Sequence, residues 1–270
     1  MNTSGKTPRR TNWAIVAAIA AVSAAALCRP GQSRASIIWG VQFVTPNGSP
    51  TGSAVELTSS QTAGLSPQDN WNPILLRNSS NTNLSYSDAP VNDNAGNNPI
   101  TISFNAFTDN YNTGTYNGGA TTNDILLSGA AKENGVGSTG TIILGGVPTG
   151  TYSLIAYTVD DNAGDTGAYT IGTATYYALN QEGSAWNGTF IPTTSTTLAG
   201  ATTPTNYVEF TGLTPSAGQI AISFEYAAGS SDGVAINALQ LIAAPEPRSL
   251  ALLAVAGAGL LLIGRRRKPA

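Results

Sequence analysis

The chain of 270 residues has 10% charged residues, 30 glycines, 15 prolines and no histidine. This composition is unlike that of helical cytosolic proteins and favours an all-β protein. Without histidine, Ser-His-Asp and Cys-His triads and histidine-ligated zinc sites are excluded. The net charge of −3 conceals an asymmetry, because residues 36–243 hold fourteen acidic and two basic residues, a formal charge of −12. So acidic a body repels phosphate backbones, which argues against nucleic-acid binding.

The N-terminal segment has the three parts of a secretory signal peptide. A basic start precedes an alanine-rich apolar stretch at 13–27, and Ser33 and Ala35 are small residues at positions −3 and −1 of a cut after Ala35. We therefore expect a signal peptide over residues 1–35 and an exported body, by either the general secretory or the twin-arginine route. An uncleaved N-terminal anchor is the alternative. The single cysteine, Cys28, lies before the cut, so we expect no disulfide in the body.

Short apolar runs in the body are separated by turns rich in glycine and asparagine, and we expect each run to form a strand. In 98–107 and 218–227 the apolar residues alternate, as in a strand with one buried face. The expected strands are 37–45, 98–107, two within 140–161 around Gly-Val-Pro-Thr-Gly, 167–179, 205–214, 218–227 and 233–244.

A short helix or turn is expected within 122–135, capped by Asn123 or Asp124. No linker of domain-splitting length interrupts residues 36–243. The sequence therefore predicts a single all-β domain, an antiparallel β-sandwich of about ten short strands in two sheets.

The stretch Val-Asp-Asp-Asn-Ala-Gly-Asp-Thr-Gly gathers several side-chain oxygens. Asp160, Asp161 and Asp165 offer the hard ligands that Ca²⁺ prefers, although their spacing does not fit the EF-hand loop. Because aspartate, asparagine and glycine also form turns, an acidic turn without metal is the alternative. The stretch 88–98 carries the same ambiguity. We expect no other cofactor.

Two tryptophans are candidate glycan contacts. Trp186 and Trp71 lie in the polar stretches Glu-Gly-Ser-Ala-Trp-Asn and Gln-Asp-Asn-Trp-Asn-Pro. Flat aromatic rings present a large apolar surface with a polar edge, which suits the face of a sugar. The alternative is that these rings fill the core or close the ends of the sandwich. A glycosidase would need two carboxylates about 5–10 Å apart, which sequence spacing does not show, and we do not expect an enzyme.

The C-terminal tail has three consecutive parts. They are the triplet Pro245, Glu246 and Pro247, an apolar run over 249–264, and the basic residues Arg265, Arg266, Arg267 and Lys268. A helix of this length covers about 24 Å against a hydrocarbon core of about 30 Å, so it spans only marginally. The basic cluster is expected to stay in the cytoplasm. The prolines keep the residues before the span extended. We expect a transient inner-membrane anchor, with an ordinary short anchor as the alternative.

This order of triplet, short apolar run and basic end resembles the PEP-CTERM sorting signal of Gram-negative bacteria, a tail signature also called the ice-binding protein C-terminal domain. The resemblance implies an exosortase, an integral-membrane protease, as partner. It further implies removal of the tail and delivery of the body to the cell surface or an exopolysaccharide matrix.

The body carries a looser resemblance. The stretches Gly-Val-Pro-Thr-Gly-Thr-Tyr-Ser-Leu-Ile-Ala-Tyr and Gly-Val-Ala-Ile-Asn-Ala-Leu-Gln-Leu are similar to a body found in PEP-CTERM proteins of planctomycete- and verrucomicrobium-like bacteria. That resemblance implies a galactose-binding-like jelly roll and carries over no functional residues.

Together these features predict a signal peptide (1–35), a β-sandwich body (36–243) and a sorting tail (244–270). The expected function is that of an exported, non-catalytic protein of the cell surface or exopolysaccharide matrix, with polysaccharide as a candidate ligand. The alternatives are a purely structural or adhesive envelope protein and a polysaccharide-active enzyme.

Overall fold

The computed structural model describes residues 37–45, 55–76, 84–107, 109–112, 121–160, 162–229 and 233–244. The expected signal peptide with Ala35, and the tail from Pro245 to Lys268, lie outside these residues. Within the described ranges, no helix is long and apolar enough to cross a membrane.

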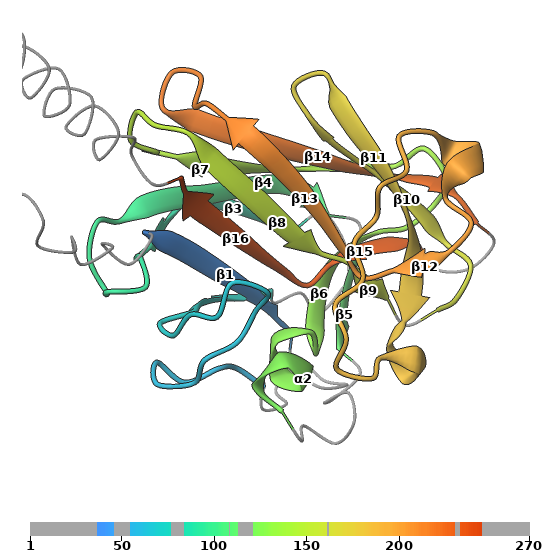
Figure 1. Ribbon diagram of the computed structural model, residues 1–270, viewed down its shortest axis with the longest axis horizontal. Helices are drawn as coiled ribbons and strands as arrows, with labels where there is room; N and C mark the ends of the chain where they lie inside the picture. Colours follow the sequence, from blue (N-terminus) through green and yellow to red (C-terminus); the bar gives the residue numbers. More distant parts are fainter. Residues whose placement is uncertain are drawn as a thin grey trace, which may run out of the picture. The chain divides into compact units, whose positions relative to one another are not determined.

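The described residues form a β-sandwich, which confirms the all-β prediction (Figure 1). One layer is a five-stranded sheet, in the order β13 (Tyr207–Leu213), β8 (Tyr152–Tyr157), β16 (Ala238–Ala243), β1 (Ile38–Val44) and β2 (Asn72–Leu75). The other layer is an eight-stranded sheet, in the order β12 (Pro204–Thr205), β11 (Ala174–Glu182), β10 (Thr166–Ile171), β14 (Gln219–Ala228), β7 (Thr139–Gly145), β4 (Ile100–Phe107) and β3 (Leu84–Val91), with β9 (Val159–Asp160) paired to β11.

A smaller sheet of three strands lies beside these layers. Its order is β15 (Val234–Ile236), β6 (Gly129–Glu133) and β5 (Asp109–Asn112). A short helix, α2 (Thr122–Leu126), and two 3₁₀ turns at Gly183–Ala185 and Leu198–Gly200 complete the described elements.

Most neighbouring strands are antiparallel, as predicted. Three pairs among the described strands are parallel instead: β1 with β2, β11 with β12 and β11 with β9. In each of these pairs one strand is short, because β2, β9 and β12 are only two to four residues long. These short strands extend the sheet edges without changing the antiparallel centre.

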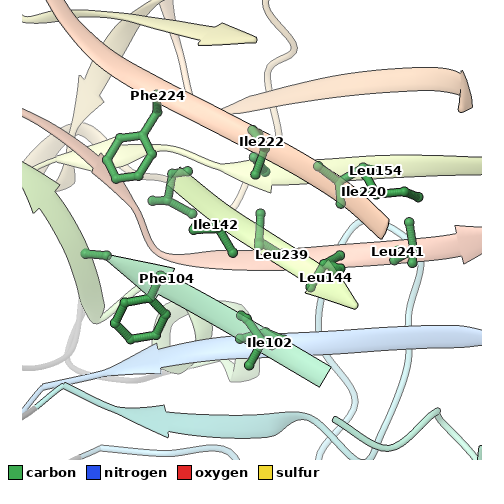
Figure 2. Close-up of a cluster of buried hydrophobic side chains, with 14 of the residues drawn as sticks. Ile102, Phe104, Ile142, Leu144, Leu154, Ile220, Ile222, Phe224, Leu239 and Leu241 are labelled. Atoms are coloured by element: carbon green, nitrogen blue, oxygen red, sulfur yellow. The ribbon is translucent and has the colours of Figure 1, made fainter. Parts of the chain in front are cut away.

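The main core lies between the two large sheets. Figure 2 shows Ile102, Ile142 and Ile222 of the eight-stranded sheet beside Leu239 and Leu241 of the five-stranded sheet. The predicted alternation is confirmed on β14, where Ile220, Ile222 and Phe224 are buried and the residues between them are exposed or half-buried. An alternating strand buries one face and leaves the other toward solvent, so the pattern fixes which side of the eight-stranded sheet faces outward.

The central strands of the five-stranded sheet are buried on both faces, and all seven residues of β1 are buried. Its second face is covered by the segment 55–71, by α2 and by residues 183–190, which together form a second apolar cluster. The rings of Tyr157, Trp186 and Phe190 meet in this cluster, with centroids 5.3 Å apart for Tyr157 and Phe190 and 5.2 Å apart for Trp186 and Phe190.

Two expected strands are interrupted. The segment 167–179 is a hairpin of β10 and β11, because Gly172 has φ of 60° and turns the chain between them. The segment 233–244 is divided at Asn237, which is fully buried. Its side-chain oxygen accepts from the Val159 amide at 2.7 Å. The break therefore lets the chain pass from the small sheet to the five-stranded sheet.

The short helix begins earlier than expected. Thr121 is its N-cap, and Asp124 lies at the third helical position, where the two form a capping box. Asp124 accepts from the Thr121 amide at 2.8 Å, and Thr121 Oγ1 accepts from the Asp124 amide at 3.2 Å. The prediction of Asn123 or Asp124 as the cap is wrong, because Asp124 reaches back to the cap from inside the helix.

Truncating a core side chain of β7 should test the sandwich. Ile142 is fully buried, and Ile142→Ala should lower the free energy of unfolding by about 2–5 kcal/mol through lost burial and a residual cavity. Its neighbour Ile143 is half-buried on the opposite face of β7, so Ile143→Ala is the matched control and should cost less. Urea unfolding of both variants measures the difference, and equal losses would contradict the assigned faces of the sheet.

Candidate functional site

Both tryptophans predicted to contact glycan are buried. Trp186 is 2% exposed and Trp71 is 4% exposed. Trp186 Nε1 donates to Asp124 Oδ1 at 2.7 Å, and Trp71 Nε1 donates to the Gln68 carbonyl at 3.1 Å. The expectation that these polar stretches expose their rings is wrong, because both rings cover the second face of the five-stranded sheet. In this structure neither ring is open to stack on a sugar, and the core-filling alternative holds.

Asp160, one of the predicted calcium ligands, lies in a buried ion pair. Lys132 Nζ is 3.0 Å from Asp160 Oδ1, and the exposed fractions of the two side chains are 2% and 0%. Lys132 is the one basic residue in the described part of the chain. An ammonium group therefore sits where the sequence suggested a metal ion.

Asp165, the second predicted ligand, is also buried and has protein partners. Tyr226 donates its hydroxyl to Asp165 Oδ1 at 2.8 Å, and the Gly233 amide donates to Oδ2 at 3.3 Å. A β-carbon at Gly229 would lie 2.0 Å from Asp165 Oδ1, so the approach of this carboxylate requires glycine there. Asp161 lies outside the described residues. Within the described ranges no three Asp, Glu, His or Cys side chains are grouped to hold a metal, and the calcium site stays a prediction.

The second acidic stretch, 88–98, contains an exposed turn that begins at a buried aspartate. Asp93 is 2% exposed and accepts from the amides of Ala95 at 3.0 Å and Asn97 at 2.8 Å. Asn98 Nδ2 also donates to its other oxygen, at 2.7 Å. Asp93 thus accepts hydrogen bonds from the backbone amides of its own turn, as aspartate does in Asx turns.

A buried phenol lies near the ion pair. The Tyr169 hydroxyl is 3.2 Å from Asn180 Oδ1 and 3.1 Å from the Ala235 carbonyl, and the ring is fully buried. Burial raises the pKa of Tyr169 well above its ordinary value, and the charge of Asp160 acts in the same direction. Tyr169 therefore stays a neutral hydrogen-bonding group in the folded protein.

The outward face of the eight-stranded sheet carries a row of hydroxyl groups across four strands. Thr170 pairs with Thr175 of β11 and with Ser223 of β14, and Ser223 pairs with Thr141 of β7. All four residues are half-buried, and the Thr170 and Thr175 hydroxyl oxygens are 2.9 Å apart. We call these four residues the hydroxyl row. Adjacent strands are about 4.8 Å apart, so the four side chains lie side by side across the sheet.

The neighbouring cross-strand row adds an aromatic ring and a carboxylate. Tyr177 pairs with Ala168, and Ala168 pairs with Glu225. Tyr177 is half-buried and Glu225 is exposed. A partly exposed ring beside aligned hydroxyls combines apolar contact area with hydrogen-bonding groups.

Sequence reasoning missed the hydroxyl row. The signal was present in the outward positions of the alternating strands, as in Gly-Thr-Ile-Ile and Ile-Ser-Phe-Glu. Only the pairing register brings Thr141, Ser223, Thr170 and Thr175 into line, and the sequence alone does not give that register.

The described surface is acidic. Exposed carboxylates belong to Glu56, Asp69, Asp88, Glu209 and Glu225. The single basic side chain in the described ranges, Lys132, is buried. The absence of nucleic-acid binding stays a prediction, and exposed carboxylates would repel a phosphate backbone.

No protein-family model matches the chain, and no curated protein matches it. Among solved structures the chain is similar to the protein YXIM from Bacillus subtilis, with a TM-score of 0.36 and 9% sequence identity. The match covers 77% of this chain and 40% of that one, so this chain spans about two fifths of the length of the Bacillus protein.

The buried phenols should make stability fall in alkaline solution. Burial raises the pKa of both Tyr157 and Tyr169, whereas tyrosines in the unfolded chain ionise near pH 10. The stabilisation is complete below about pH 10 and is lost as the pH rises toward the folded-state pKa, because the unfolded chain releases those protons first. Urea midpoints between about pH 8 and pH 11 should decrease, and less steeply in Tyr169→Phe. Equal slopes for the two proteins would contradict this role for Tyr169.

Proposed function

We propose that this chain is an exported, non-catalytic β-sandwich that is sorted by its PEP-CTERM tail to the cell surface or exopolysaccharide matrix, where it contacts polysaccharide. The delivery half of the proposal is supported by the order of segments in the sequence: a signal-peptide pattern, an acidic body, then triplet, short apolar run and basic end. The partners of this route are an exosortase-type protease and the bacterial inner membrane.

The observation that carries the polysaccharide half is the hydroxyl row with Tyr177 beside it. Hydroxyl groups both donate and accept hydrogen bonds, so a row of hydroxyls suits a ligand that itself carries several hydroxyls. The exposed carboxylates of the described surface repel anionic chains. We therefore favour a neutral polysaccharide and move the candidate contact from Trp186 and Trp71 to the outward face of β10, β11, β14 and β7.

Removing hydroxyls from the row should weaken binding without disturbing the fold. Thr170→Val with Thr175→Val keeps the shape and the strand preference of both positions and removes their hydroxyls. We expect this double variant to bind neutral polysaccharides at least about tenfold more weakly, from the loss of hydrogen bonds of about 1 kcal/mol each. Thr211→Val, at an exposed position of β13 in the other sheet, is the matched control and should bind normally.

The readout is pull-down with neutral matrix polysaccharides, and circular dichroism confirms that each variant is folded. Unchanged binding in the double variant would contradict the assigned face. A wild-type protein that binds no polysaccharide would contradict the ligand and leave a structural or adhesive role.

The sorting half has its own experiment. Replacing Pro245, Glu246 and Pro247 with alanine should leave the tail attached and the protein in the membrane fraction, because the site of protease recognition is lost. Wild-type protein should lack the tail and appear at the cell surface. Cell fractionation with mass spectrometry of the C-terminus checks both, and a tail retained in wild type would contradict the proposal.

A further inference from the structure

The ion pair of Lys132 and Asp160 joins two different parts of the sandwich. Lys132 lies on β6 of the small sheet, and Asp160 ends β9, which pairs with β11. Both side chains are essentially excluded from solvent, with Nζ 3.0 Å from Oδ1. Lysine and aspartate are almost never fully buried unless they are paired.

The surroundings of this pair are poor in water. The neighbouring residues Val159, Val234 and Ala235 are 0% exposed. In such surroundings the charged forms lose their hydration, and transfer of the proton from the ammonium to the carboxylate gives a neutral amine and a carboxylic acid. These two neutral groups are the reactants of amide formation.

We propose that Lys132 and Asp160 condense within the folded chain to form a covalent amide cross-link. The lone pair of Nζ attacks the Asp160 carboxyl carbon and forms the C–N bond. The C–O bond to the hydroxyl then breaks, and the hydroxyl leaves with a proton from the nitrogen as one water molecule. The ammonium–carboxylate pair thus becomes an amide and water, and no oxidant, reductant or further reactant is needed.

The fold supplies the proximity that the reaction requires. Reacting groups held in direct contact behave as if at very high concentration. Nζ lies 3.0 Å from Oδ1, and this oxygen is bonded to the carboxyl carbon that the amine attacks. Lys132 precedes β7 in the sequence and Asp160 follows β8, so folding alone brings the two side chains together. The reaction therefore does not depend on export or on the sorting tail.

The cross-link would give the body a covalent stabilisation that a disulfide cannot provide. Residues after Cys28 include no cysteine, so a disulfide within the body is impossible. An amide between β6 and β9 closes a loop that contains β7 and β8, and a covalent closure restricts the unfolded chain as a disulfide does. Unlike a disulfide, it is insensitive to reducing agents.

Digestion of the wild-type protein with a glutamate-specific protease tests the proposal directly. Cleavage after Glu56, Glu133 and Glu182 separates Lys132, in peptide 57–133, from Asp160, in peptide 134–182. After denaturation and digestion we expect one branched species whose mass is the sum of the two peptides less about 18 Da, the mass of the water lost in this modification. Recovery of 57–133 and 134–182 only as separate, unmodified peptides would overturn the proposal.

Two variants locate the bond. Lys132→Arg keeps a cation that pairs with Asp160, but the guanidinium stays protonated and does not form the amide, so it should give separate peptides. Asp160→Ala lacks the carboxyl carbon and should also give separate peptides. A branched species that persists in Lys132→Arg would overturn the assignment to this pair. The wild-type digest stands on its own if either variant fails to fold.

Discussion

The sandwich depends on one buried amide at the point where its sheets meet. Asn237 receives a hydrogen bond from the Phe43 amide and donates its own amide to Tyr157, which joins it to β1 and β8. Its side chain accepts from the Val159 amide and donates to the carbonyls of Leu127 and Gly129, at 3.0 and 3.2 Å. These five bonds connect four segments: β1, β8, β9 and residues 127–129, which run from the end of α2 into β6. An unpaired amide at a fully buried position is costly, so the four segments are held in register together.

That junction explains where ligand contact is and is not available. Past Asn237 the chain enters β16, a central strand of the five-stranded sheet. The centre of this sheet has the sandwich core on one face and the aromatic cluster of Tyr157, Trp186 and Phe190 on the other. The large aromatic rings are therefore used to cover a sheet. The outward face of the eight-stranded sheet carries threonine and serine in their place, and the function proposed above follows from this division between an aromatic inner cover and a hydroxylated outer face.

The sequence predicts the parts of this structure that depend on local periodicity. Alternating apolar residues located β4 and β14, and turn-forming residues separated β7 from β8. The parts that depend on distant partners were not predictable. Trp186 stands in a polar stretch but is buried against Phe190, and Asp124, far away in the chain, accepts its indole hydrogen. Likewise the sequence suggested a metal ion at Asp160, whereas the fold places Lys132 beside it. The hydroxyl row depends on the register of four strands, which the sequence does not give.

The inward position of Lys132 also bears on resistance to proteolysis. In the described part of the chain, the surface presents neither lysine nor arginine, because the one basic side chain there is 1% exposed. Proteases that recognise a basic side chain next to the scissile bond must first expose that side chain, and access to Lys132 requires opening of β6. Digestion at Lys132 therefore requires the rare opening of the native state. The burial of Lys132 thus also hides the one basic side chain of the described residues from trypsin-like proteases.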